Sequence, residues 1–476
     1  MNEPVAPAAV AEAEAAYVSL YQKQEKIYPR SVQGRFARLR WVTVWLTQAV
    51  FYGVPWLTWN GRQAVLFDLD APRFYVFGLV LQPQDLVFLA GLLVVAALAL
   101  FFFTAVAGRL WCGYACPQTV YTEIFLWIER HTEGDRSARI RLDAAPWGAN
   151  KLARKGGKHL AWALVALFTG FTFVGYFIPI RELSGQLAAL ALGPWSTFWV
   201  LFYGAATYGN AGWMREQICK YMCPYARLQS TMIDADSLVI AYDNLRGEPR
   251  GPRARTADPG ALGLGACVDC TLCVQVCPTG IDIRKGLQNE CIGCAACIDV
   301  CNTVMDRLGY APNLIRYATA NGVERGWTNA QMLRRLWRPR VLAYGALLLA
   351  GTTVFGVGLA MRAPVAMDVI RDRGTLARLG DGGRIENVYR VQLANRTDRA
   401  ASYRLAAEGL PGLVVDAPVT WQLAAGEVRP FTVRLALSAE DAAAAGPGPQ
   451  PIRFRLVAPD AGGIVVDERS TFIVPR

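Results

Sequence analysis

Eight cysteines between residues 267 and 301 have the spacing of iron–sulfur ligands. The chain reads Cys267-x-x-Cys270-x-x-Cys273-x-x-x-Cys277-Pro278 and repeats this spacing in the second four cysteines. Three cysteines spaced by two residues can wrap one cubane, while the fourth reaches the neighbouring one. The predicted ligands of one 4Fe-4S cluster are therefore Cys267, Cys270, Cys273 and Cys301, and those of the other are Cys291, Cys294, Cys297 and Cys277.

This spacing is the bacterial two-cluster ferredoxin pattern. A structural zinc site usually uses one set of four ligands with a longer separation, and disulfides are disfavoured in a reducing cytoplasm. One departure stands out, because Cys277 is followed by Pro278 whereas Cys301 is followed by Asn302. We expect the hydrogen bonding around one cluster to differ without loss of a ligand. Two adjacent clusters favour a one-electron relay over a purely structural role.

The other four cysteines form two pairs, each in the pattern Cys-x-x-x-Cys-Pro. The first pair is Cys112 and Cys116, and the second is Cys219 and Cys223. On a helix this spacing places both sulfurs on one face, and the proline after each pair ends or kinks the helix. If the two segments pack about a pseudo-twofold axis, all four thiols converge. Soft thiolates select copper(I), zinc or iron–sulfur, so these cysteines are candidate copper or redox thiols; small buried cysteines at helix ends are the alternative.

The composition is that of a membrane protein. Of 476 residues, 53% are hydrophobic and 18% are charged, which argues against a disordered chain and an ordinary soluble enzyme. The chain has twelve cysteines and only two histidines, which disfavours a haem protein because haem iron usually needs axial histidine ligands. Five stretches lack Asp, Glu, Lys and Arg over the length of a transmembrane helix, at 41–59, 86–107, 160–180, 195–214 and 341–361.

The loop charges predict an orientation. Lys and Arg number six in residues 1–40, two in 60–85, nine in 108–159, one in 181–194 and sixteen in 215–340. By the positive-inside rule, the N-terminus and the cluster region face the cytoplasm, and the residues after 361 are exported. The net charge of +11 therefore reflects basic cytoplasmic loops, and we expect no nucleic-acid partner. No cleaved signal peptide is expected.

The exported segment changes character. Short alternating runs rich in β-branched residues are separated by Gly, Pro, Asp and Asn, which predicts an antiparallel β-sandwich over 362–476. This segment has no Cys and no His, so we expect a docking module. The predicted fold is a five-span helical bundle with a cytoplasmic two-cluster insert and this sandwich. Its domains are 1–40, a cytoplasmic segment; 41–214, two helical hairpins; 215–340, with clusters at about 258–306; 341–361, the fifth span; and 362–476.

These motifs and their order together resemble the cytochrome c oxidase accessory protein family called CcoG, also FixG or RdxA. The resemblance covers nearly the whole chain and includes 111–119 (WCGYACPQT), 218–227 (ICKYMCPYAR), both cluster motifs and 305–317 (MDRLGYAPNLIRY). It implies that the C-terminal segment has an immunoglobulin-like fold. It also implies a role in building the cbb3-type haem–copper oxidase, with reduction of copper(II) to copper(I) in the cytoplasm.

The resemblance implies a cupric reductase in the bacterial inner membrane. Copper would be the substrate or a transient ligand of Cys112, Cys116, Cys219 and Cys223. The implied partners are copper chaperones, cbb3 oxidase subunits or assembly factors, and an unidentified electron donor; a homo-oligomer is left open. Two alternatives stay in view. One is a quinol-linked membrane electron-transfer subunit, and the other is a non-catalytic assembly scaffold.

Overall fold

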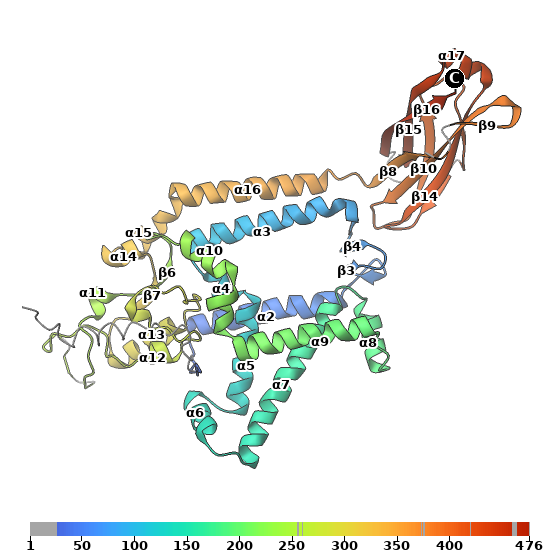
Figure 1. Ribbon diagram of the computed structural model, residues 1–476. Helices are drawn as coiled ribbons and strands as arrows, with labels where there is room; N and C mark the ends of the chain where they lie inside the picture. The colour runs from blue at the N-terminus through green and yellow to red at the C-terminus, as the bar shows by residue number, and fades with distance from the viewer. Residues whose placement is uncertain are drawn as a thin grey trace, which may run out of the picture.

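A computed structural model describes residues 26–475 except 255, 256, 259, 373, 375, 376, 419 and 459–463. The first part of the predicted segment 1–40 therefore lies outside the described residues. A helical bundle occupies the middle of the molecule, with the cysteine-rich insert at one end and a β-sandwich at the other (Figure 1). The cluster motifs and the sandwich thus lie at opposite ends of the long helices.

Two long apolar helices run side by side along the bundle. Helix α3 (Leu86–Ala107) covers the predicted span 86–107, and α16 (Pro339–Ala360) covers most of 341–361 (Figure 1). Helix α3 ends at Ala107, and the next residue, Gly108, has a positive φ of 53°, which glycine adopts more easily than other residues. Helix α16 begins with a proline at its first position, where no intrahelical N–H is needed.

Three described helices are long and apolar enough to cross a membrane, and they are Pro83–Ala107, Ala149–Val174 and Pro339–Ala360. The predicted first and fourth spans form shorter helices. Helix α2 (Arg35–Gly53) begins before 41 and stops well before 59, because Pro55 opens a short 3-10 turn and a β-strand follows. Helix α9 (Pro194–Tyr208) passes into a π-helical turn, Gly209–Met214. The structure therefore supports a membrane-spanning bundle, while the number of five spans stays a prediction.

The third predicted span is shifted along the chain. Helix α7 (Ala149–Val174) begins eleven residues before the charge-free stretch 160–180 and ends before Gly175 and Pro179. Buried lysines of its first turns, Lys151 and Lys158, explain why the helix extends into a charged region. Lys158 pairs with Glu133 at 3.1 Å. The charge-free stretch therefore located the apolar segment correctly, but it did not give the ends of the helix.

The shorter elements complete the bundle and its loops. The helices are α4 (Leu110–Tyr114), α5 (Pro117–Thr132), α6 (Arg136–Ala144), α8 (Ile180–Ala188), α10 (Pro224–Met232), α14 (Ala320–Glu324) and α15 (Asn329–Arg334). Between α2 and α3 lie the strands β1 (Thr58–Trp59), β2 (Arg62–Gln63), β3 (Val65–Asp68), β4 (Arg73–Val76) and β5 (Leu79–Leu81). The last three strands form an antiparallel sheet in the order β3-β4-β5.

The cysteine-rich insert has little regular structure. Strands β6 (Val239–Tyr242) and β7 (Ile315–Ala318) pair antiparallel, and the helices are α11 (Asn244–Gly247), α12 (Leu272–Gln275) and α13 (Ala296–Leu308). Its small core contains cysteines packed with Ile240, Ile298 and Met305. So few apolar side chains form a marginal core on their own, which is typical of domains that a metal cofactor holds together.

The C-terminal region is an antiparallel β-sandwich. One sheet has the order β12-β14-β10-β8 with β9 beside β10, and the other has β13-β11-β15-β16. The strands are β8 (Val365–Arg371), β9 (Arg378–Leu379), β10 (Ile385–Asn395), β11 (Ala401–Glu408), β12 (Val414–Asp416), β13 (Thr420–Leu423), β14 (Val428–Leu437), β15 (Gly448–Ala458) and β16 (Ile464–Val474), with α17 (Ala439–Ala445) between β14 and β15. Alternate side chains, such as Tyr389, Val391 and Leu393, are fully buried between the sheets.

A buried ion pair attaches the sandwich to the bundle. Asp85, just before α3, accepts hydrogen bonds from Arg362 after α16, and it lies 3.5 Å from the Arg396 guanidinium. Asn60 also donates to Asp398 at 2.7 Å. The sandwich is therefore fixed to the ends of α3 and α16 rather than tethered through a free linker.

Candidate electron-transfer and metal sites

The two cluster motifs share one backbone conformation. Asp269 and Thr271 in the first motif have φ values of 55°, and the equivalent Gly293 and Ala295 in the second have φ values of 72° and 59°. Left-handed residues are uncommon outside glycine. In each motif, one left-handed residue on each side of the second cysteine turns the chain sharply. Three cysteines spaced by two residues therefore face one cavity.

The structure gathers the first predicted ligand set around one cavity. Its walls include Cys267, Cys270, Cys273 and Cys301. Burial, followed by the neighbouring thiols of Cys273, Cys267 and Cys270, raises the pKa of Cys301 to about 12. Cys270 is exposed, so this first cluster cavity reaches the surface of the insert.

The second predicted ligand set lines a separate, adjoining cavity. Its walls include Cys277, Cys291, Cys294 and Cys297, together with Cys273 of the first set. Burial raises the pKa of Cys291 to about 12 and that of Cys297 well above its usual value. Because Cys273 borders both cavities, the two candidate sites are immediate neighbours.

The missing second proline has a structural consequence. Helix α12 ends before Cys277 and Pro278, whereas α13 continues through Cys301 as far as Leu308. A proline inside a helix removes a backbone hydrogen bond and clashes with the preceding turn. Asn302 avoids both effects, and its side-chain oxygen accepts a hydrogen bond of 2.7 Å from the Asn313 backbone.

The donor chemistry of these cavities fits 4Fe-4S clusters. In their present arrangement, no three His, Cys, Asp or Glu side chains among the described residues, the four membrane cysteines included, could hold a metal ion. Four cysteines around each of two cavities are the donors that cubanes require, each thiolate binding a different iron. The raised pKa values of Cys273, Cys291, Cys297 and Cys301 keep these four thiols protonated until a cationic group binds and displaces the protons.

Neither membrane cysteine pair lies on one regular helix. Cys112 belongs to α4, whereas Cys116 caps the N-terminus of α5, with Pro117 as the first residue of that helix. Cys219 lies in a π-helical turn, Ile218–Met222, and Cys223 caps α10 ahead of Pro224. The prolines therefore begin the following helices instead of ending the preceding ones. This corrects the expectation of two sulfurs on one helical face.

The four membrane thiols nevertheless converge. Burial raises the pKa of Cys112 to about 12, and the thiols of Cys116, Cys219 and Cys223 contribute to this shift. Burial also raises the pKa of Cys219 to about 11, with contributions from Cys116 and Cys223. The Cys112 thiol donates to the Gln229 side-chain oxygen at 3.3 Å. The two Cys-x-x-x-Cys-Pro segments thus lie near enough for their thiols to influence one another, and we call Cys112, Cys116, Cys219 and Cys223 the four-thiol site.

The four-thiol site abuts the second cluster cavity. A Cβ atom on Gly113, next to Cys112, would lie 2.6 Å from the Gly293 carbonyl oxygen and 3.0 Å from the Cys294 backbone nitrogen. Tyr317 donates to the same Gly293 carbonyl at 2.9 Å. Backbones can approach this closely only where side chains are absent. The loop between Cys291 and Cys294 is therefore pressed against the α4 turn.

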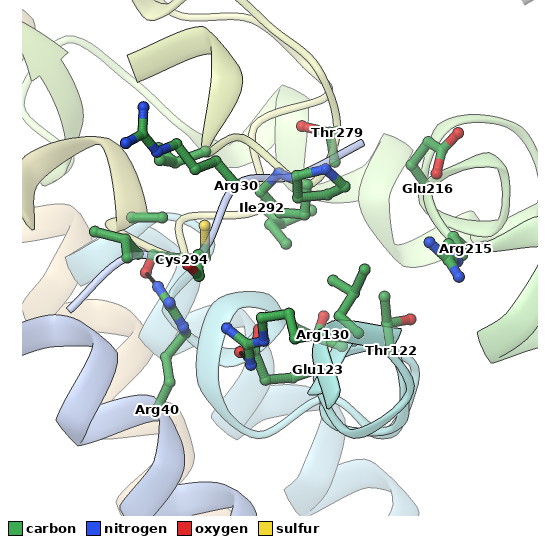
Figure 2. Close-up of a pocket in the computed structure, with 18 of the residues that line it drawn as sticks. Arg30, Arg40, Thr122, Glu123, Arg130, Arg215, Glu216, Thr279, Ile292 and Cys294 are labelled. Carbon is green, nitrogen blue, oxygen red and sulfur yellow. Dashed lines mark hydrogen bonds and ion pairs between the residues drawn. The ribbon is translucent and has the colours of Figure 1, made fainter. Parts of the chain in front are cut away.

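A cavity opens between the bundle and the insert (Figure 2). Its walls include Cys219 of the four-thiol site and Cys294 of the second cluster cavity. Arg40 extends from α2 towards Cys294 in this view, while Arg215 and Glu216 lie across the cavity (Figure 2). The cavity is therefore bordered by one cysteine of each set.

Several residues that support these sites were not predicted. Asp299 accepts hydrogen bonds from the backbone N–H groups of Phe36 and Ala37, at 3.2 and 2.7 Å, and so caps α2 from the insert. Arg40 and Arg109 are both buried beside the second cluster cavity. A lone charged residue beside an apolar run is a weak signal for such a role. The two histidines of the chain, His131 and His159, bond to the Trp127 carbonyl and the Tyr208 hydroxyl.

Comparison with known proteins identifies three regions of the chain. Family models match a 4Fe-4S dicluster domain at residues 214–320, a 4Fe-4S binding domain at 89–133, and the IG-like fold at the C-terminal of FixG at 355–475. The match at 89–133 includes Cys112 and Cys116. The chain therefore has two regions of the 4Fe-4S type and a C-terminal IG-like domain.

Curated relatives match over most of their length. The nitrogen fixation protein FixG of Rhizobium meliloti is 39% identical over 425 residues, covering 82% of this chain and 81% of the relative. Protein RdxA of Cereibacter sphaeroides is 40% identical over 405 residues, covering 83% and 84%. The crystal structure of a FixG-related protein from Vibrio parahaemolyticus is 27% identical and covers 24% of this chain and 97% of its own, with a TM-score of 0.21.

Proposed function

Because this chain belongs to the FixG/RdxA family of iron–sulfur membrane proteins, we propose that it reduces copper(II) to copper(I) for assembly of a cbb3-type oxidase. The single observation that carries the proposal is the four-thiol site held against a predicted cluster site by Gly113 and Gly293. Thiolates are the soft ligands that favour copper(I).

The proposed ligand sets follow the two cavities. Cys267, Cys270, Cys273 and Cys301 would hold the first cluster, and Cys277, Cys291, Cys294 and Cys297 the second. When bound, these groups supply one-electron transfer. The chain itself positions the second cavity against α4, encloses its thiols, and leaves Cys270 exposed towards a donor. The donor would be a reduced one-electron carrier protein of the cytoplasm.

The reaction balances with one electron per copper. Each copper(II) takes up one electron to become copper(I), and the carrier protein is oxidised by one electron. Protons leave Cys112 and Cys219 when these buried thiols bind the metal, because their raised pKa values keep them protonated beforehand. The product would pass to copper chaperones. The cluster region and N-terminus would face the cytoplasm of the inner membrane, and the sandwich the periplasm.

The test uses the full chain purified without oxygen, reduced with dithionite and freed of it by gel filtration, with a copper(I)-specific chelator as readout. We expect Ser at positions 112, 116, 219 and 223 together to abolish copper reduction while about eight irons per chain remain. Persistent reduction in this variant would overturn the proposal. A fall from about twelve irons to about eight would instead show that the four thiols hold a third cluster. In cells, the same variant should fail to restore oxidase activity to a deletion strain.

A second function, quinol oxidation, is favoured by one further cavity. Its walls include His159, Trp162, Trp213, Arg215 and Glu216, and it shares the last two with the cavity that reaches Cys219. The His159 ring lies 2.7 Å from the Tyr208 hydroxyl. A quinol would release two electrons and two protons here, with His159 and Glu216 as proton acceptors. Reduction of the clusters by a water-soluble menaquinol, lost in His159→Phe, would support this function; no reduction by quinol would exclude it.

A further inference from the structure

A buried arginine from the membrane bundle contacts the second cluster cavity. Arg40 of α2 is 7% exposed, and its guanidinium donates to the Cys294 carbonyl (Figure 2). Its Nε atom is buried without a hydrogen-bond partner. The carboxylates that influence it through space are already engaged, since Glu123 lies 3.5 Å from Arg130 and Asp299 caps α2. No direct ion pair with Arg40 occurs in the described part of the chain.

A second buried arginine lies beside the loop of the second cluster motif. Arg109 is 7% exposed and lies between α3 and α4. Its guanidinium donates to the Ala226 carbonyl at 2.7 Å, and it lines a cavity together with Cys291. Its positive charge opposes the pKa increases of Cys291 and Cys112 alike. Arg109 therefore stands between the second cluster cavity and the four-thiol site.

The first cluster cavity has a different charge balance. Arg284 lines it beside Cys273, but this guanidinium bonds to Asp282 at 2.8 Å and also to Asp269. Its positive charge is thus neutralised by two carboxylates. The two cavities differ accordingly. Among the described residues, the two arginines beside the second cavity have no direct ion-pair partner, whereas the arginine that lines the first is already paired.

We infer that Arg40 and Arg109 are positioning residues that raise the reduction potential at the second cluster site above that at the first. Reduction adds one negative charge, and an unpaired cation stabilises that charge strongly where water is excluded. The added electron therefore resides preferentially at the site that touches Gly113, next to the four thiols. This inference rests on the proposed cluster ligation but not on copper as the substrate.

The test is an anaerobic redox titration of the full chain followed by EPR, with iron analysis of every variant. We expect Arg40→Gln and Arg109→Gln to lower the potential of the same one of two couples, by about 59 mV for a tenfold loss of electron affinity. Arg40→Lys should restore most of the potential. Arg38→Gln is the matched control, because Arg38 is an exposed residue of the same helix.

The outcomes separate this inference from the proposed function. Unchanged potentials in both variants with full iron content, or equal shifts of both couples, would overturn the inference. Arg284→Gln should shift the couple that Arg40→Gln and Arg109→Gln leave unchanged. If Arg284→Gln instead shifted the couple that those two variants shift, the inference would also be overturned. Loss of copper reduction plays no part in this readout. A chain without iron would contradict the proposed ligation itself.

Discussion

Gly113 and Gly293 lie back to back where the membrane bundle meets the cysteine-rich insert. A Cβ atom on Gly113 would stand 2.6 Å from the Gly293 carbonyl oxygen, and one on Gly293 would stand 2.9 Å from the Arg109 carbonyl oxygen. Each glycine is adjacent to a cysteine, Cys112 in one case and Cys294 in the other. This contact brings two sets of thiols together that are far apart in the sequence.

The contact predicts that Gly113→Ala slows electron delivery to copper. The added methyl group meets backbone, which cannot move aside easily, so the insert must shift away from α4; such overpacking typically costs about 1–3 kcal/mol. We expect slower reoxidation of the dithionite-reduced protein by copper(II), measured by stopped-flow absorbance, with the iron content unchanged. Gly157→Ala is the control, because a Cβ there meets nothing within 4 Å. Equal rates in the two variants would contradict the prediction.

A second prediction concerns Asp299, which caps α2 from the insert. Asp299→Ala removes the acceptor of two backbone hydrogen bonds and the negative charge at the helix N-terminus. The cost should be about 0.5–2 kcal/mol, as for other N-cap losses. Hydrogen exchange at Phe36 and Ala37 should accelerate accordingly. The exposed Asp306 lies on the same helix, and Asp306→Ala should leave this exchange unchanged.

A third prediction follows from the raised pKa values at the four-thiol site. Burial and the neighbouring thiols raise the pKa of Cys112 to about 12 and that of Cys219 to about 11. Because the thiolate is the nucleophile, alkylation of the metal-free site should be slow at pH 7 and rise about tenfold per pH unit up to pH 10. Mass spectrometry after iodoacetamide treatment measures this rate. A plateau near pH 8.5, as for free cysteine, would show that the site is not buried.

Sequence patterns grouped the cysteines by spacing but did not locate every helix boundary. The two sets of cysteines that the spacing groups line two adjoining cavities, because the motif is local and needs only two left-handed residues per turn; their role as cluster ligands stays a prediction. The stretch 86–107 matched α3 to the residue, since Asp85 and Gly108 flank it. The stretch 41–59 did not match α2, because glycine and proline at 53 and 55 end the helix before its apolar run ends.

The supporting residues could not be predicted for a different reason. Arg40 is one of several basic residues before an apolar run, and the sequence around Asp299 does not indicate that it caps a distant helix. Their roles depend on how the insert docks on the bundle, which is a contact between segments more than 250 residues apart, as the separation of 254 between Arg40 and Cys294 shows. Local spacing carries no information about such a contact.

A fourth prediction tests why Asn302 replaces the expected proline. Asn302→Pro would place a proline inside α13, which continues to Leu308, and should cost about 3 kcal/mol or more. The break falls directly after Cys301, so we expect the first cluster to be lost while the second is retained, with iron falling from about eight to about four per chain. Asn302→Ala removes only the side-chain bond to Asn313 and should keep both clusters. If Asn302→Pro retained full iron, Cys301 would not need the continuous helix, and the assignment of this cysteine to the first cavity would lose its structural basis.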